Sequence, residues 1–231
     1  MAGGEDPPSE LTDMTDSMRG VMGLDGDVDK LAAFYDGWAA AYDEDVGTHG
    51  YGMPATVVAT MLAAIAADPR LASLADRSVR VLDAGCGTGQ VGRCLVDAGY
   101  RNLRGVDLSP EMVNVAAALG IYRSLRGGVD LTAPVDDELA AAADIVTVGG
   151  VFTVGHVPPE ALATMAGLVR PGGLLVVSTR KAYHEQTDYR RVSARLVADG
   201  RLDLIHHVED GPYTMDSTGD YWAYRVNERD S

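Results

Sequence analysis

The sequence predicts an α/β domain with a parallel sheet and an antiparallel pair of strands at one edge. Between residues 79 and 178, short aliphatic runs alternate with helical stretches, which is the pattern of βαβ units. A glycine-rich turn at residues 85–89 follows the first of these runs. Two extended runs, 201–210 and 220–226, close the chain, and their short connection predicts antiparallel pairing.

Length and charge limit the domain number and the partners. The 231 residues suffice for one domain with one core. The 19 Lys and Arg against 34 Asp and Glu give a net charge of −15, which repels polyanions, so we expect no nucleic-acid partner. Residues 1–26 are acidic and broken by Gly and Pro, which predicts a flexible tail. Residues 27–231 are predicted to form the single domain, with residues 27–70 as an N-terminal helical cap.

The N-terminus and the cysteines indicate the compartment. The first twenty residues have no basic start and no apolar core, which is unlike a secretory signal or a membrane anchor. Two cysteines do not make a disulfide framework. We therefore expect a cytoplasmic protein without a membrane partner; the sequence does not determine its oligomeric state.

In the N-terminal cap, apolar residues recur at spacings of three and four. They are Leu31, Phe34, Trp38 and Tyr42. This spacing predicts one helix whose shared face is buried, and we interpret Phe34 and Trp38 as core rather than as a stacking platform for a ligand. A second helix is predicted over residues 54–67, from a favourable first-turn proline to an Asp-Pro break.

The remaining elements follow in order. Strands are predicted over residues 79–82, 103–106, 122–125, 145–148 and 174–178. Helices are predicted over residues 90–98, 109–120 and 136–143, from 158 onward, and over 188–198. The helix at 109 has the clearest start, because Ser109 is a good cap, Pro110 suits the first turn and Glu111 complements the helix dipole.

The stretch VLDAGCGTGQ is the strongest functional signal. Gly85, Gly87 and Gly89 follow a strand directly, and their bare backbone lets a ligand approach closely. Gln90 stands where the dinucleotide fingerprint requires a glycine. Asp83 would repel a pyrophosphate, whereas S-adenosylmethionine presents a positive ammonium and a sulfonium. The loop therefore predicts S-adenosylmethionine as the cofactor.

A second acid supports this interpretation. Asp107 follows the next predicted strand, in GVDLSPEMV, eighteen residues after Gly89. A carboxylate at this strand end can accept hydrogen bonds from both ribose hydroxyls.

Four segments give the chain its resemblance to class I S-adenosylmethionine-dependent methyltransferases: DAGCGTG, GVDLSPEMV, DIVTVGG and LVRPGGLLVVST. The resemblance covers about residues 30–228. Within this group, YDGWAAAYDEDV with Tyr51 and Pro54 resembles the methyltransferase-like proteins named after the Williams-Beuren syndrome region. The resemblance implies a Rossmann-like seven-stranded methyltransferase sheet with its last strand antiparallel and an N-terminal helical extension.

The resemblance also implies cofactor-binding residues. The methionine end would be covered by Tyr42 and lined by Asp83, Gly85, Cys86, Gly87, Gly89 and Gly149. Ribose and adenine would be held by Asp107, Leu108, Met112, Asp130 and Leu131. The family's usual Gly-Asp-Ala pattern near the adenine amino group is replaced here by GGVDL.

Histidines are the candidates for catalysis. His156 follows the fourth predicted strand and is a candidate general base for a hydroxyl acceptor, the alternative being a structural loop histidine. His184, next to Tyr183, follows the fifth strand and is a candidate for the acceptor pocket. His49 and Tyr51 are candidates for a lid.

Metal chemistry is not expected. His206 and His207 are adjacent on a predicted strand, so they point to opposite faces and do not form a ligand pair. We therefore predict no metal site.

These observations leave three functions open. The first is methyl transfer to a small-molecule acceptor, on O, N or C. The second is an enzyme that binds S-adenosylmethionine without methylating, such as a cyclase in secondary metabolism. The third, a non-catalytic partner subunit, is disfavoured because the glycine loop and both acids are intact.

Overall fold

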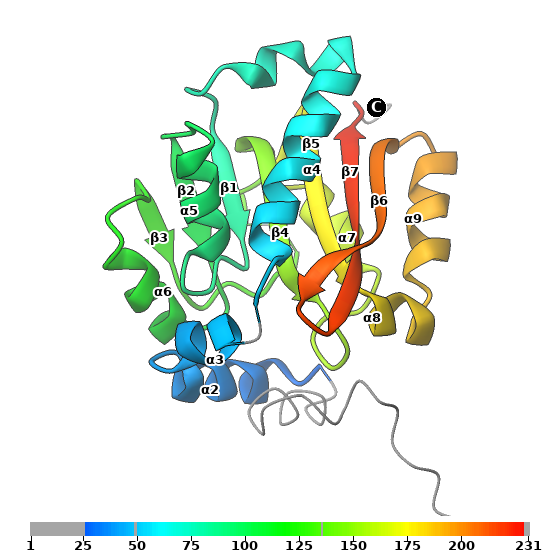
Figure 1. Ribbon diagram of the computed structural model, residues 1–231. Helices are drawn as coiled ribbons and strands as arrows, with labels where there is room; N and C mark the ends of the chain where they lie inside the picture. Colours follow the sequence, from blue (N-terminus) through cyan, green and yellow to red (C-terminus); the bar gives the residue numbers. More distant parts are fainter. Residues whose placement is uncertain (1–25, 49, 135, 229–231) are drawn as a thin grey trace, which may run out of the picture.

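A mixed sheet forms the centre of the protein. The computed structural model describes residues 26–48, 50–134 and 136–228, and within these residues seven strands are ordered β3-β2-β1-β4-β5-β7-β6 (Figure 1). The strands are β1 Val81–Ala84, β2 Leu103–Val106, β3 Ser124–Arg126, β4 Ala143–Phe152, β5 Val169–Arg180, β6 Leu202–Thr214 and β7 Ser217–Val226. The predicted Rossmann-like seven-stranded fold is confirmed.

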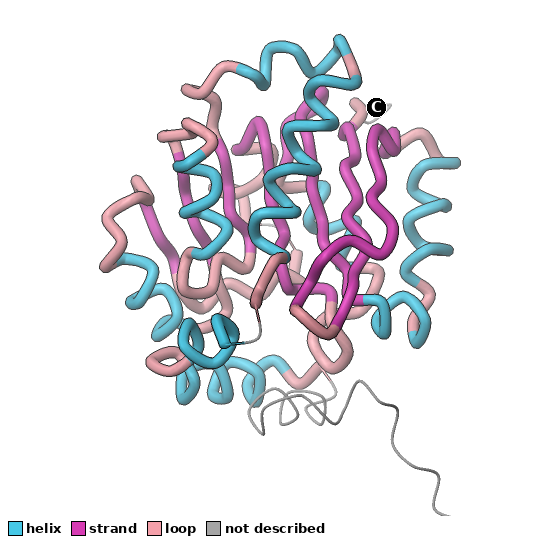
Figure 2. Tube along the Cα trace, viewed as in Figure 1, coloured by secondary structure: helices cyan, strands magenta, loops and turns pink. Residues whose placement is uncertain are grey.

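Helices surround this sheet (Figure 2). They are α2 Val28–Trp38, α3 Tyr42–Thr48, α4 Met53–Ala67, the 3-10 helix η2 Pro69–Ala75, α5 Gln90–Asp97, α6 Pro110–Ala117, α7 Ala161–Ala166, α8 Lys181–Gln186 and α9 Tyr189–Ala198. No helix in the described ranges is long and apolar enough to cross a membrane.

The strand directions bring the functional loops to one edge. β1, β2, β3, β4 and β5 are parallel, while β7 pairs antiparallel with β5 and β6, as the sequence predicted. The carboxyl ends of β1, β4 and β5 therefore point to the lower edge in Figure 1, and α2 and α3 lie at this edge next to α6. Ligands of such sheets bind outside this edge.

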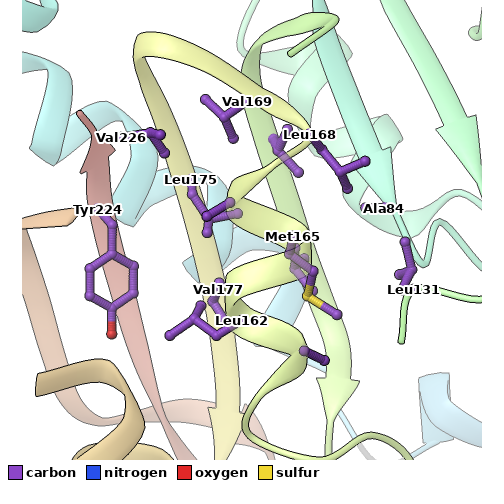
Figure 3. Close-up of a cluster of buried hydrophobic side chains, with 14 of the residues drawn as sticks. Ala84, Leu131, Leu162, Met165, Leu168, Val169, Leu175, Val177, Tyr224 and Val226 are labelled. Atoms are coloured by element: carbon purple, nitrogen blue, oxygen red, sulfur yellow. The ribbon is translucent and has the colours of Figure 1, made fainter. Parts of the chain in front are cut away.

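Both faces of the sheet are covered by apolar side chains. On one face, Leu162 and Met165 of α7 pack against Leu175 and Val177 of β5 and Tyr224 of β7 (Figure 3). On the other face, a second buried cluster joins residues of α4 and α5 to β1, β4 and β5. Burial on both sides explains why the central strands are almost continuously apolar in the sequence.

The N-terminal cap contains two helices, so the prediction of one helix through Tyr42 is wrong. α2 ends at Trp38, and the amide of Ala41 donates to the Trp38 carbonyl in a tight turn before α3 begins. The turn lets the buried Trp38 indole donate to Asp45 at 2.6 Å, which a straight helix would not allow. Trp38 is 8% exposed, in the small core that the sequence predicted for it. The predicted tail, residues 1–26, lies outside the described residues except for Gly26.

Residues 137–141 form turns rather than the helix predicted over 136–143, and Ala143 already belongs to β4. Ala141 has a left-handed φ of +49°, and its amide donates to the Gly167 carbonyl at 2.9 Å rather than to a carbonyl one turn earlier. This tertiary contact stops the helix that the alanine run favours. The short helix α8, directly after β5, was not predicted.

A buried carboxyl group ties three elements of the sheet region together. Asp83 of β1 is 1% exposed and accepts hydrogen bonds from the Tyr122 hydroxyl at 2.7 Å and the Thr147 hydroxyl at 3.0 Å. Burial raises the pKa of Asp83 to about 6, although both hydroxyl donors oppose the increase.

The raised pKa gives a testable pH dependence of stability. Because the folded pKa is above the unfolded value of 3.8, the stabilisation from Asp83 is complete below pH 3.8 and is lost as the pH rises through about 6. The asparagine in Asp83→Asn does not ionise, so this variant does not lose stability in this way as the pH rises. Relative to the unaltered protein, its free energy of unfolding should rise by about 1.5 kcal/mol between about pH 5 and about pH 7.5. Urea denaturation of both proteins measures this, with the exposed Asp97→Asn as control; parallel curves for Asp83→Asn and the unaltered protein would contradict it.

Candidate functional site

A cavity of about 120 Å³ lies at the carboxyl edge of the sheet. Its walls come from the loops that follow β1, β2 and β3, from the end of β4, and from α2 and α3. The lining residues are Val28, Leu31, Tyr35, Tyr42, Gly85, Gly87, Asp107, Leu108, Met112, Val129, Asp130, Leu131, Thr132, Gly149, Gly150, Val151, His156 and Val157.

The glycine loop forms the floor of this cavity. The amides of Gly85 and Cys86 both donate to the Val106 carbonyl, at 2.8 and 3.0 Å, which fixes the loop on the end of β2. Gly87 has a φ of +51°, and a Cβ on it would meet no atom within 4 Å. A side chain at this position would project into the open space of the cavity, so glycine keeps the wall of the cavity free for a ligand.

Asp107 connects the glycine loop to the start of α6. Its Oδ2 accepts from the Gly87 amide at 2.8 Å and its Oδ1 from the Ser109 amide at 2.9 Å. Burial raises the pKa of Asp107, while the backbone donors oppose the increase. A carboxylate offers about four lone-pair sites, so acceptor capacity remains for hydroxyl groups of a ligand.

Next to Asp107 the wall becomes apolar. Leu108, Met112 and Leu131 offer side chains to a flat, weakly polar group such as adenine. Asp130 lies at the same wall, and its Oδ1 accepts from the Thr132 amide at 2.8 Å and hydroxyl at 2.6 Å. Both bonds fall on one oxygen, which leaves Oδ2 to face an amino group. Together with the open position at Gly87, this wall fits the adenosine part of S-adenosylmethionine.

Two carboxylates hold the N-terminal helices over the cavity. Asp36 of α2 accepts from the Ser109 hydroxyl at 2.5 Å and from the Glu111 amide at 3.2 Å, at the start of α6. Asp43 of α3 accepts from the Thr88 hydroxyl at 2.5 Å and from the Gln90 amide group at 3.0 Å, at the glycine loop. We call α2 and α3 the lid, because each is attached to one of the two cofactor loops.

His156 meets the lid inside the cavity. Its Nδ1 lies 3.3 Å from the Val154 carbonyl, which only accepts, so Nδ1 carries the proton and Nε2 accepts from the Tyr35 hydroxyl at 2.5 Å. Burial lowers the pKa of His156 to about 4, although the bond to Val154 opposes this. The imidazole is therefore neutral at physiological pH, with its lone pair directed at Tyr35.

A group of tyrosines adjoins the cavity at Gly150. A Cβ on Gly150 would lie 3.2 Å from the Tyr51 hydroxyl and 3.7 Å from the Tyr213 hydroxyl. The Tyr51 and Tyr213 rings meet edge to face with centroids 6.0 Å apart. Burial raises the pKa of Tyr42 and Tyr51, so their hydroxyls stay protonated. We call Tyr35, Tyr42, Tyr51 and Tyr213 the tyrosine compartment.

The structure brings together most of the residues that the sequence predicted for the cofactor. Those that line the cavity are Tyr42, Gly85, Gly87, Asp107, Leu108, Met112, Asp130, Leu131 and Gly149. Asp83, Cys86 and Gly89 do not line it. Asp83 of β1 and Cys86 of the loop are buried, and Gly89, with a φ of +91°, is the N-cap of α5. Their proximity to a methionine end remains a prediction.

Of the predicted catalytic residues, only His156 reaches the cavity. α8 carries His184 to the α9 face of the sheet, where its Nδ1 lies 3.9 Å from Asp220 Oδ2. Tyr183 is buried there and donates to the Val157 carbonyl at 2.8 Å. His207 also bonds to Asp220, at 3.1 Å. In the described ranges, no three potential metal-ligating side chains are grouped. The lid candidate His49 lies outside the described residues.

Sequence reasoning missed several residues at or beside the cavity, among them Arg180, Tyr35 and Tyr213. Arg180 is the last residue of β5, and the rule that ligands bind at strand ends, applied to the full strand, would have found it. Tyr35 lies on the helix whose other aromatic residues were recognised. Tyr213 comes from the end of β6, and no local signal places it near the cavity.

Comparison with known proteins identifies the family. The methyltransferase domain family matches residues 59–227. Human methyltransferase-like protein 27 is 35% identical over 151 residues, covering 64% of this chain and 56% of the human protein. The tRNA U34 carboxymethyltransferase of Cellvibrio japonicus is 33% identical over 143 residues, covering 61% of this chain and 42% of that protein. The chain thus spans about half the length of the curated relatives it matches.

Solved structures agree on the fold. The crystal structure of the [4+2]-cyclase SpnF superposes with a TM-score of 0.62 at 16% identity, covering 86% of this chain and 96% of the cyclase. At this identity the likeness concerns the fold alone. With the family match and the seven-stranded sheet, the resemblance seen in the sequence is confirmed, and the chain belongs to the methyltransferase domain family of class I S-adenosylmethionine-dependent enzymes.

Proposed function

We propose that this protein transfers the methyl group of S-adenosylmethionine to a small-molecule acceptor. The observation that carries the proposal is the lidded cavity in which Gly87 and Asp107 face the lid residues Tyr35 and Tyr42. A lid attached directly to both cofactor loops encloses the reaction site, which suits an acceptor small enough to be covered. The net charge of −15 also disfavours a nucleic-acid acceptor.

The acceptor is placed by the lid and the end of β4. When bound, S-adenosylmethionine supplies a methyl group on a sulfonium, a good leaving group for in-line displacement. The tyrosine compartment and Gly150 would orient the acceptor beside it. Tyr35 donates to His156 and keeps oxygen lone pairs free to accept the acceptor's proton. As that proton reaches Tyr35, the phenol proton moves to His156 Nε2, so no buried phenolate forms.

Labelling distinguishes the classes of acceptor. The protein is incubated with methyl-labelled S-adenosylmethionine and an extract of its producing cells, divided by ultrafiltration into metabolites and macromolecules. We expect label in the metabolite fraction and one S-adenosylhomocysteine formed per methyl transferred. Label confined to RNA or protein would contradict a small-molecule acceptor. A new product without S-adenosylhomocysteine would indicate the non-methylating alternative, such as a cyclase.

Asp107→Asn tests the ribose site. The substitution removes the charge from the hydrogen bonds that Asp107 offers to a ribose, so affinity for S-adenosylhomocysteine should fall by about 1.5 to 3 kcal/mol, or roughly 10- to 150-fold. Isothermal titration calorimetry measures this, with the exposed Asp97→Asn as control. Unchanged affinity in a folded variant would mean that the ribose is held elsewhere.

Asp43→Ala tests the lid. Loss of the bonds to Thr88 and Gln90 detaches α3 from the glycine loop, so S-adenosylhomocysteine should dissociate about tenfold faster. Stopped-flow displacement gives the rate, and Glu44→Ala, an exposed neighbour on the same helix, is the matched control. Equal dissociation rates in the two variants would show that α3 does not restrain the cofactor.

His156→Asn tests the proton path with an acceptor found by labelling. Turnover should fall by about 100-fold while affinity for S-adenosylhomocysteine is kept, and Tyr35→Phe should cause a similar loss. Because the pKa of His156 is about 4, the turnover of the unaltered protein should show no inflection from this residue between about pH 5.5 and about pH 8. His206→Asn, outside the cavity, is the control. Normal turnover in His156→Asn would assign this histidine a structural role.

A further inference from the structure

Arg180 lies at the carboxyl end of β5, in contact with the tyrosine compartment. It is the last residue of β5 and pairs with Gly219 of β7. Its guanidinium lies over the Tyr213 ring, 5.1 Å from the centroid. This cation–π contact holds the guanidinium beside the site.

This arginine lacks an acidic partner although the chain is strongly acidic. Within residues 26–48, 50–134 and 136–228, no carboxylate lies within ion-pair distance of Arg180. Its neighbour Lys181 pairs with Asp210 at 2.9 Å, and Arg190 pairs with Asp220 at 3.0 Å. The sequence has 34 acidic against 19 basic residues, yet this half-buried cation has no anion within the described residues. The half-buried Arg201 has no ion pair there either, but Arg180 is the one that lies against the tyrosine compartment. A ligand is a natural source of that anion.

The positive charge of Arg180 acts on the tyrosine compartment and on His156. Burial raises the pKa of Tyr51 and Tyr213, and the Arg180 guanidinium opposes both increases. Arg180 likewise opposes the increase for Tyr35, and it adds to the decrease in the pKa of His156 that burial causes. An anion at Arg180 would therefore lie within electrostatic range of the Tyr35 and His156 pair.

We propose that Arg180 binds a carboxylate group of the methyl acceptor, so that the substrates of this enzyme are small carboxylic acids with a flat or apolar body. The inference rests on the proposed function and names the substrate class of the same site. The planar guanidinium matches a carboxylate in two parallel hydrogen bonds. The tyrosine rings cover the body of the acid, and the nucleophile of the acid then faces Tyr35.

A monoanion fits this position better than a phosphate. A phosphate would bring a second negative charge to a protein whose net charge is already −15 and to a site that contains Asp107. The carboxylate of the cofactor itself is the rival occupant of Arg180. The two occupants differ in their consequence, because only the rival makes Arg180 necessary for cofactor affinity.

The experiment compares acids with their neutral amides. Calorimetry first establishes that S-adenosylhomocysteine binds to the unaltered protein; failure at this step would contradict the proposed function and not the assignment of Arg180. The protein saturated with S-adenosylhomocysteine is then titrated with benzoate, 4-hydroxybenzoate and indole-3-acetate, and with the three matching carboxamides. We expect at least one acid to bind about tenfold or more tightly than its amide.

Arg180→Met should abolish the preference for the acid, while Arg195→Met, an exposed arginine on α9, should keep it. Affinity for S-adenosylhomocysteine should stay within about twofold in Arg180→Met, and this binding also shows that the variant is folded. If Arg180→Met does not fold, the neutral and polar Arg180→Gln replaces it. If no acid binds, or if the amides bind equally well to the unaltered protein, the proposal is overturned. A tenfold loss of S-adenosylhomocysteine affinity in Arg180→Met would assign Arg180 to the cofactor carboxylate and overturn it as well.

Discussion

The carboxylate of Asp107 is the interaction on which the site depends. It accepts from the Gly87 amide on one side and from the Ser109 amide on the other, so a single charged group sets the distance between the glycine loop and α6. The parallel pairing of β1 with β2 brings these segments to the same edge, with Ala84 opposite Val106. Burial raises the pKa of the Asp107 carboxyl group, and the hydrogen bonds from backbone amides lower it. The effect of burial is the larger, so the pKa is raised.

The lid is also held by carboxylates that accept hydrogen bonds from these two loops. Asp36 and Asp43 reach from the N-terminal helices to donors at the starts of α6 and α5, where helix N-termini favour a negative charge. The lid thus contacts the protein where the cofactor loops begin. We therefore expect cofactor binding to affect the position of the lid, because displacement of either loop removes an anchor of the lid.

The proposed acceptor site combines part of the cavity with the tyrosine compartment beside it, and its residues come from distant parts of the chain. Tyr35 comes from the lid, His156 from the loop after β4, Arg180 from the end of β5 and Tyr213 from β6. Their contacts combine buried hydroxyl groups, a neutral imidazole and one guanidinium without an ion pair in the described part of the chain. This mixture suits a ligand with an aromatic or apolar body and one negative charge.

The sequence alone determined the Rossmann-like fold and predicted that the glycine loop and Asp107 lie together at the carboxyl edge of its sheet. Gly85, Gly87 and Asp107 occupy strand ends whose chemistry is local, because a turn needs glycine and a ribose needs an acceptor wherever the sheet places them. Only the tertiary structure decided the rest. It divided the N-terminal helix so that the Trp38 indole could bond, ended the alanine run at Ala141 through a contact with Gly167, and turned His184 away from the cavity that Arg180 adjoins. These outcomes depend on contacts between distant segments, which periodicity and local propensity do not record.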